Sequence, residues 1–144
     1  MKKLLVSILI AWLTTTGVYA QDLKSSDVPE NVKSSCQKKY PESAKYKVAW
    51  EKEKGNYEAN WGGKSGEDNS AQFTPSGDFV EIVKAIPVSD LPPAVSQYVK
   101  THFNGDHISE AGKVTDAKGK QTYEAEVKGK DLIFDLNGNY LGKD

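Results

Sequence analysis

Hydrophobic residues at four-residue steps predict a helix near the start of the chain. Val28, Val32, Cys36 and Tyr40 follow one another at this spacing, and together they form one apolar stripe. Pro41 ends the pattern, because a proline disfavours the helical conformation of the residue before it. Cys36, the single cysteine, lies inside the stripe. A reactive or pairing thiol and a small buried apolar residue are both open readings of Cys36, and the stripe favours the buried one.

A second stripe of the same kind begins about sixty residues later. Its members, which share one helical face, are Leu91, Val95, Tyr98, Val99, His102 and Phe103. Asn104-Gly105 follows, and these residue types readily adopt the left-handed backbone that ends helices. The sequence therefore predicts a second helix that ends before Asn104.

Apolar and polar residues alternate after the first helix, which is typical of half-buried strands. Gly55-Asn56 predicts a two-residue hairpin turn that would place Trp50 opposite Trp61. The apolar face would then hold Tyr46, Val48, Trp50, Ala59 and Trp61, and the charged face Lys47, Glu51, Glu53, Glu58 and Asn60. This register favours the two tryptophans as a core pair rather than as anchors for a partner.

The later hairpins are predicted in the same way. A turn at Lys118-Gly119 places Val114, Tyr123, Ala125 and Val127 on an apolar face, and Lys113, Glu124 and Glu126 on a charged one. Ser76-Gly77 and Asn137-Gly138 predict the last turn of each segment. They place Phe73 opposite Val80 and Phe134 opposite Leu141 inside, with Phe79 and Tyr140 facing outward.

The two segments are similar in sequence. Asp27-Val28-Pro29 recurs as Asp90-Leu91-Pro92, and Tyr57-Glu58-Ala59 recurs as Tyr123-Glu124-Ala125. Such self-similarity indicates a duplication. We expect an α+β fold of two tandem repeats, residues 27–86 and 87–144. Each repeat is a helix on a four-stranded antiparallel sheet, and residues 21–26 form a mobile lead-in.

Residues 1–20 have the pattern of a secretory signal peptide. Lys2 and Lys3 precede an apolar run from Leu4 to Leu13, and Val18-Tyr19-Ala20 offers small residues for cleavage after Ala20. An uncleaved anchor helix is the alternative, which is disfavoured because no longer apolar run follows. We therefore expect a periplasmic or secreted protein with no membrane span after cleavage.

Composition narrows the classes of partner. The formal net charge of the chain is −1, and removal of Lys2 and Lys3 would change it to −3. All the cationic residues apart from histidine are Lys, and Arg is absent. Readers of phosphates and base edges depend on the bidentate Arg side chain. Nucleic acid is therefore not an expected partner.

The sequence offers little catalytic chemistry. His102 and His107 are five residues apart, which does not match the spacing of a helical metal pair. Asp135-Leu-Asn137-Gly-Asn139 has its glycine at the fourth position and lacks the closing Glu of a calcium loop, so it is predicted to be a hairpin turn. We expect no enzyme activity, no catalytic residues, no cofactor and no metal site.

The residues described so far resemble a known family. The Val28-Pro29 and Leu91-Pro92 helix starts, Tyr40-Pro41, Trp50, Tyr57, Phe73 and the Gly77 turn are similar to the PepSY-like, β-lactamase-inhibitor-like family of exported bacterial proteins. The resemblance spans residues 27–144. It implies tandem helix-plus-sheet repeats, similar in fold to β-lactamase inhibitory protein, and supplies no catalytic residues.

These observations predict a non-catalytic module that binds another exported protein, with inhibition of an exported hydrolase or peptidase as one form. The alternative is a small-ligand-binding or structural envelope protein. The charged side of the sheet is expected to bind poorly, because Lys and Glu are depleted at interface centres. The candidate contact residues are Phe79 with Val83 and Tyr140 with Ile133. In the alternative interpretation, Phe79 and Tyr140 pack the junction between the repeats.

Overall fold

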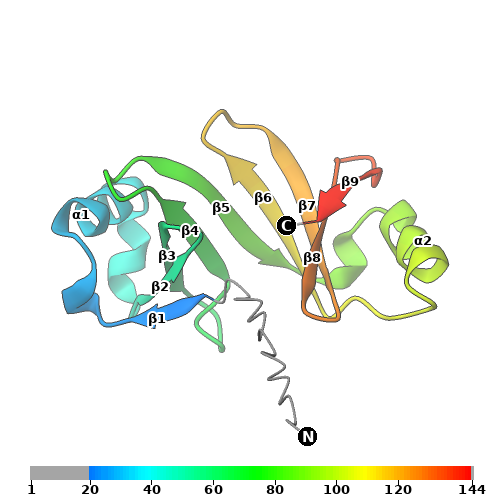
Figure 1. Cartoon of the computed structure of the whole chain (residues 1–144), viewed down its shortest axis with the longest axis horizontal. Helices are drawn as coiled ribbons and strands as arrows, with labels where there is room; N and C mark the ends of the chain where they lie inside the picture. The colour runs from blue at the N-terminus through cyan, green and yellow to red at the C-terminus, as the bar shows by residue number, and fades with distance from the viewer. Residues whose placement is uncertain (1–19, 144) are drawn as a thin grey trace, which may run out of the picture.

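The structure is a computed structural model that describes residues 20–143. The predicted signal peptide, residues 1–20, lies outside the described residues apart from Ala20. The described chain forms one antiparallel sheet with two α-helices (Figure 1). Neither helix is long and apolar enough to cross a membrane within the described part of the chain.

Helices and strands follow one another in a simple order. The helical elements are η1 (Ser25–Asp27), α1 (Glu30–Lys39), η2 (Pro41–Lys45), η3 (Val88–Asp90) and α2 (Pro93–His102). The strands are β1 (Gln21–Leu23), β2 (Ala49–Glu53), β3 (Asn56–Trp61), β4 (Asn69–Phe73), β5 (Phe79–Ile86), β6 (Glu110–Asp116), β7 (Gln121–Val127), β8 (Lys130–Phe134) and β9 (Tyr140–Lys143). The strand order across the sheet equals the order in the chain.

One continuous nine-stranded sheet replaces the two four-stranded sheets expected from the sequence. The two halves join through β5 and β6, which pair from Glu81 opposite Asp116 to Ile86 opposite Ala111. The expected mobile lead-in is also wrong, because Gln21–Leu23 forms strand β1 and pairs with β2. The fold is thus a mixed helix and sheet architecture dominated by its sheet.

Each helix covers its own core. Val32 and Cys36 of α1 pack on the first core, and Val95 and Val99 of α2 on the second. All four side chains are almost fully buried, as the four-residue spacing predicts. The burial of Cys36 as a core residue is confirmed.

Both helices lie on the same side of the sheet. Ile82 belongs to the first core, and Ile86 packs against the second. These two residues are four apart on β5, and side chains at even spacings along a strand point to the same face. The opposite side of the sheet carries neither helix, and we call it the open face.

The β2–β3 hairpin turns one residue earlier than predicted. Lys54 and Gly55 both have positive φ, 49° and 86°, which is the conformation of a type I′ turn. Trp50 is therefore opposite Ala59 rather than Trp61. The shift of two positions leaves every side chain within the two strands on its predicted face. Trp50 and Trp61 are accordingly both buried.

Three residues predicted on this hairpin, Tyr46, Lys47 and Val48, precede its first strand. The helical turn η2 extends to Lys45, so β2 begins only at Ala49. Tyr46, expected on the apolar face, is instead 50% exposed. Lys47, expected on the charged face of the sheet, lies before the first residue of the strand.

Three of the remaining hairpins share a longer loop that the sequence reading missed. These loops are residues 74–78, 116–120 and 135–139. Each has Thr or Asp at its first position and Gly at its fourth, a pattern written Thr/Asp-x-x-Gly-x. In the second loop, the Asp116 carboxylate accepts hydrogen bonds from the backbone N–H groups of Lys118 and Lys120. Gly119, at φ 81°, donates its N–H to the carbonyl of Asp116. These are three-residue loops with a glycine in the left-handed region.

The extra loop residue changes which side chains are inside. A register shift of one moves side chains to the other face of the sheet. Val114, predicted inside, therefore pairs with Val83 and Thr122 on the open face. Lys113, predicted on the charged face, pairs with Tyr123 on the helix-covered side.

In the last hairpin of each half, β4–β5 and β8–β9, a β-bulge next to the turn restores the predicted register in the rest of the hairpin. Gln72 pairs with Glu81, but Phe73 pairs with Phe79 rather than Val80. Likewise Phe134 pairs with Tyr140 rather than Leu141. Phe79 and Tyr140, predicted to face outward, consequently share the helix-covered side with Phe73 and Phe134.

Candidate binding face

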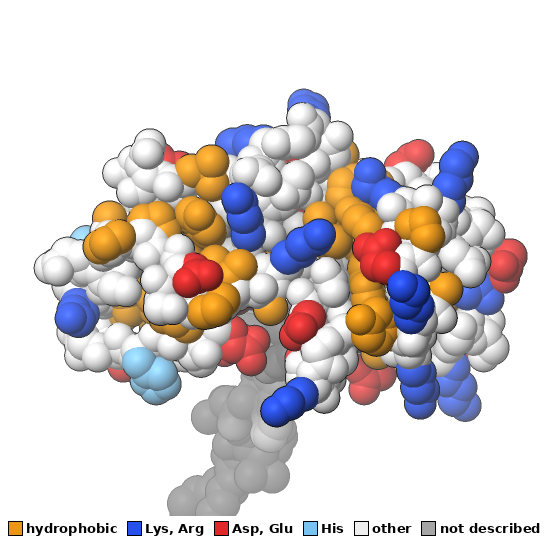
Figure 2. Space-filling model, turned by 180° about the vertical axis from the view of Figure 1, so that it is seen from behind, with side chains coloured by type: hydrophobic (Ala, Val, Ile, Leu, Met, Phe, Trp, Pro, Cys, Tyr) orange, Lys and Arg blue, Asp and Glu red, His pale blue; other side chains and the backbone are white. Residues whose placement is uncertain are grey.

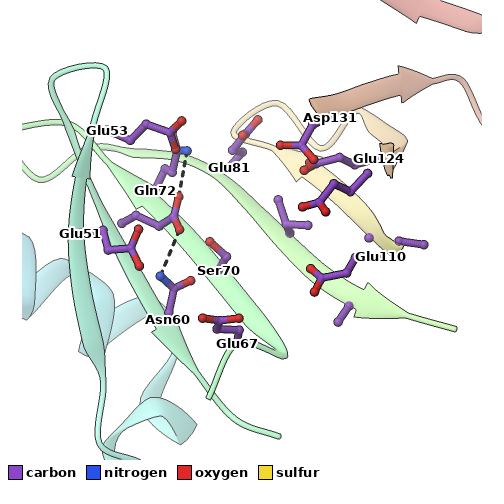
Figure 3. Close-up of a pocket in the computed structure, with 16 residues that line it drawn as sticks. Glu51, Glu53, Asn60, Glu67, Ser70, Gln72, Glu81, Glu110, Glu124 and Asp131 are labelled. Carbon is purple, nitrogen blue, oxygen red and sulfur yellow. Dashed lines mark hydrogen bonds between the residues drawn. The ribbon is translucent and has the colours of Figure 1, made fainter. Parts of the chain in front are cut away.

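The open face contains a shallow depression of about 310 Å³ that extends over strands from both halves. Nine of its sixteen lining residues are acidic, and none is Lys. The acidic residues are Glu51, Glu53, Glu58, Glu67, Glu81, Glu110, Glu124, Glu126 and Asp131. Figure 3 shows the labelled carboxylates of both halves projecting into the same space on either side of β5. We call this surface the acidic face.

Strand register places like charges directly opposite one another. Asp22, Glu51 and Glu58 form one row across β1, β2 and β3. A second row across β6, β7 and β8 consists of Glu110, Glu126 and Asp131. Like charges in directly opposed positions destabilise a sheet. The fold therefore places two rows of carboxylates in directly opposed positions on the same face.

Neutral side chains donate hydrogen bonds to two of these carboxylates, Glu58 and Glu126. Asn60 and Gln72 donate to the two Glu58 oxygens, at 3.1 and 3.2 Å (dashed in Figure 3). The Ser109 hydroxyl donates to Glu126 at 2.7 Å. Such bonds orient the carboxylates without cancelling their charge.

The effect of the opposed charges is seen in the pKa of Glu51. Partial burial raises the pKa of its carboxyl group, and the charges of Glu58, Asp22, Glu67 and Glu53 raise it further. Repulsion between neighbouring carboxylates is thus felt at the centre of the first row.

Lysines of the sheet centre lie on the other side. Lys84 and Lys113 pair with each other across β5 and β6 on the helix-covered side. In the view of Figure 2, basic, acidic and hydrophobic side chains are interspersed over the surface. The concentration of negative charge is therefore a property of the acidic face and not of the chain as a whole.

An apolar strip borders the acidic residues on the open face. A second depression is lined by Val114, Ile133 and Leu141 next to Glu81, Glu124 and, at its edge, Lys143. Val83 continues the strip into the acidic depression. Its methyl group occupies the space above Gly112, where an added Cβ would lie 2.5 Å away. Leu141 is 53% exposed, so the strip ends in an accessible aliphatic side chain.

The four contact residues predicted from the sequence are divided between the two faces. Val83 and Ile133 line the depressions of the open face. Phe79 lies 6.0 Å from the Tyr40 ring and 5.9 Å from the Phe73 ring, between ring centres, on the helix-covered side.

Tyr140 also packs within its own half. It stacks on Tyr98 at 4.5 Å, and its ring centre lies 5.7 Å from that of Phe134. Phe79 and Tyr140 therefore do not form one patch, and they do not pack a junction between the halves either. Whether any of the four residues contacts a partner stays a prediction.

The sequence reading did not identify the acidic face as a site. Glu51, Glu53, Glu58, Glu124 and Glu126 were placed correctly toward solvent, but Lys47 and Lys113 were expected among them. The recurring Thr/Asp-x-x-Gly-x pattern is the signal that would have corrected Lys113, since it indicates a three-residue loop. With the register of a three-residue loop, Lys113 lies on the helix-covered side. The depression is then lined by negatively charged residues and by no lysine.

Cys36, His102 and Asp135, whose side chains could take part in catalysis or bind a metal, are buried or interact with neighbouring groups away from the acidic face. Burial raises the pKa of the Cys36 thiol to about 11, which suppresses its thiolate form. His102 stacks on Tyr98 at 4.0 Å and its Nδ1 lies 3.0 Å from the Tyr98 carbonyl oxygen. The Asp135 carboxylate accepts from the backbone of its own loop. In residues 20–143, no three His, Cys, Asp or Glu side chains are grouped so that they could hold a metal ion.

Solved structures of the same fold come from Bacteroides. A protein of Bacteroides eggerthii, whose description reads "putative periplasmic", matches with a TM-score of 0.64 and 21% identity, over 81% of this chain and 88% of that one. A DUF2874 family protein of Bacteroides ovatus matches with 0.61 and 22%, over 81% and 86%. A BLIP-like protein of Bacteroides fragilis matches with 0.58 and 19%, over 81% and 84%. At these identities the similarity shows the fold alone.

No curated protein matches the chain. A family model does match, in two segments, residues 11–63 and 61–141. Its description is "Putative beta-lactamase-inhibitor-like, PepSY-like", which confirms the resemblance found in the sequence. With most of its length matched by this model, the chain belongs to the PepSY-like, beta-lactamase-inhibitor-like family.

Proposed function

We propose that this protein is a non-catalytic, exported module that binds another exported protein through the open face of its sheet. Inhibition of an exported hydrolase or peptidase is the specific form we favour. The observation that carries the proposal is the open face itself. Strands from both halves contribute to it, both helices lie on the opposite side, and a shallow depression spans its centre.

The dimensions and chemistry of the depression favour a protein over a small ligand. Small-molecule sites are concave and mostly apolar, and they enclose most of the ligand. Here the larger part of the lining is acidic, and the depression lies on the surface of an uncovered sheet. A broad surface of this kind suits a protein partner better than an enclosed small molecule.

The proposal includes two features of the chain that the sequence predicts. Cleavage after Ala20 would release a periplasmic or secreted protein that begins at Gln21. Repeats at 27–86 and 87–144 would make the acidic face a composite of two equivalent units. The matching Thr/Asp-x-x-Gly-x loops at 74–78 and 135–139 support the duplication.

A steric block tests the proposed face. Ser70 lies at the centre of the open face, and Ser34 is exposed on α1. The chain from Gln21 onward, carrying a photo-crosslinking residue at Gln72, is used to capture proteins from the envelope fraction. We expect a crosslinked partner that Ser70→Trp abolishes and Ser34→Trp leaves unchanged. Capture that is insensitive to Ser70→Trp would contradict binding at this face.

A further inference from the structure

This inference rests on the proposed function and names the chemistry of the partner. We propose that the open face binds a protein surface in which Lys or Arg side chains surround aliphatic ones. The cationic groups would contact the acidic face, and the aliphatic groups would contact the strip formed by Val83, Val114, Ile133 and Leu141.

Charge complementarity is the first argument. Nine carboxylates without a lysine line one depression, although Lys and acidic residues are almost equal in number over the whole chain, 19 and 20. A surface of one sign attracts partners of the other sign and repels those of its own. Carboxylates also match the forked geometry of Arg, which binds them through two parallel hydrogen bonds.

The opposed carboxylate rows are the second argument. In the row of Asp22, Glu51 and Glu58, the neighbouring carboxylates help to raise the pKa of Glu51, and like charges directly opposite one another destabilise a sheet. A cationic partner would remove this repulsion in addition to forming its own contacts. Binding should therefore stabilise the fold, and the effect should weaken as salt screens the charges.

The apolar strip is the third argument, because it does not depend on charge. Val114 is already 93% buried within the sheet, whereas Leu141 is exposed at the edge. An interface commonly combines an apolar centre with a polar rim. The strip begins at Val83 on β5 and continues across the second half of the open face, so the aliphatic residues of the partner would lie over β5 to β9.

A bare divalent cation is a weaker candidate for the same surface. Hard cations require several oxygen ligands converging on one point. Within the described residues the carboxylates are not grouped in this way. Two of them, Glu58 and Glu126, already accept hydrogen bonds from neutral side chains.

The test compares two variants with the same change in net charge. The open-face variant carries Glu51→Gln, Glu58→Gln, Glu124→Gln and Glu126→Gln. The control carries Asp27→Asn, Glu30→Gln, Glu42→Gln and Asp90→Asn, all at exposed positions on or beside the helical elements. Thermal melts establish that both variants fold.

The probe is a fluorescein-labelled peptide of alternating Lys and Leu, with a Gln-Leu peptide of equal length as its reference. In fluorescence anisotropy at low salt, we expect the open-face variant to bind the Lys peptide about tenfold more weakly or worse, and the control to lose less than about twofold. Binding should fall steeply as salt is raised. Equal losses in both variants, or equal binding of both peptides, would overturn the proposal.

Further measurements separate this inference from the proposed function. If Ser70→Trp abolishes crosslinking to the envelope partner and the open-face variant does not, the partner is not cationic, although the face still binds protein. If neither abolishes it, both proposals fail. Calorimetric titration with calcium chloride alone is the last comparison. Micromolar, stoichiometric binding that the open-face variant loses would assign the surface to a cation instead.

Discussion

Glu51 shows how a single position can reduce the stability of the fold. It lies between the carboxylates of Asp22 and Glu58 in neighbouring strands, and burial together with these charges raises its pKa. A carboxyl group whose pKa is raised by folding binds protons more strongly in the folded state. The free energy of unfolding therefore falls as pH rises from the ordinary carboxyl pKa through the raised one.

We accordingly expect Glu51→Gln to stabilise the protein at neutral pH, by roughly 0.2–1 kcal/mol, the size of a cross-strand charge effect. The gain should disappear once the pH is below the ordinary carboxyl range, where Glu51 is neutral in both states. Urea unfolding of both proteins at neutral and at acidic pH measures this difference in the free energy of unfolding. Glu30→Gln, at an exposed helix position near Lys33, is the control. A Glu51→Gln variant that is less stable at neutral pH would show that the carboxylate has a favourable partner.

Among the elements of the fold, the hairpin loops decide which side chains reach each face. Gly119 and Gly138 occupy the same position in two loops of the same kind, at φ 81° and 86°. Their surroundings differ. An added Cβ at Gly119 would meet nothing within 4 Å, whereas at Gly138 it would lie 2.9 Å from Ala94 and 3.1 Å from Pro92.

This difference gives a matched pair of substitutions. Gly119→Ala should destabilise the protein by roughly 1–2 kcal/mol, the cost of a left-handed backbone for a residue with a Cβ. Gly138→Ala should cost more, because the turn must also move away from the start of α2. Midpoints of thermal or urea unfolding compare the two variants. Equal losses would mean that the turn at residues 135–139 does not pack tightly against the helix.

The same loops mark the limit of what the sequence predicted. Four-residue apolar spacing located both helices and their buried residues, Cys36 included, because that pattern depends only on local geometry. In the β2–β3 hairpin the side chains stayed on their predicted faces, because the predicted register differs from the observed one by two residues. One extra loop residue in the β6–β7 hairpin moved Val114 and Lys113 to the opposite faces, because strands alternate with a period of two.

The candidate surface was harder to predict than the fold. Its acidic character requires the correct faces in both halves at once, and also the pairing of β5 with β6. Nothing local in either half specifies that pairing, since the strands are separated by η3 and α2. The individual glutamates could be placed toward solvent from the sequence, whereas their convergence could not.

At the scale of the whole molecule, one sheet connects two separate cores. β5 and β6 pair over six residue positions, so the second core cannot unfold without exposing the edge of the first half. We expect the two halves to unfold in one cooperative transition.

Two substitutions in different cores test this expectation. Val32 and Val95 are both fully buried, one in each core. Val32→Ala and Val95→Ala should each cost roughly 2 kcal/mol through lost burial and a small cavity. In the chain from Gln21 onward, Trp50 and Trp61 are the only tryptophans, so fluorescence reports the first half alone. Val95→Ala should nevertheless shift the fluorescence and circular dichroism midpoints together. A fluorescence midpoint unaffected by Val95→Ala would show that the halves unfold independently.

The agreement between strand order and chain order has a consequence for how the chain acquires its structure. Each strand pairs with the one that precedes it in sequence, so most pairings close only a short loop, and the entropic cost of each closure is small. Low contact order is associated with rapid folding. A chain delivered N-terminus first would thus find the partner of each new strand already in place, and the sheet could grow by one strand at a time from β1 to β9.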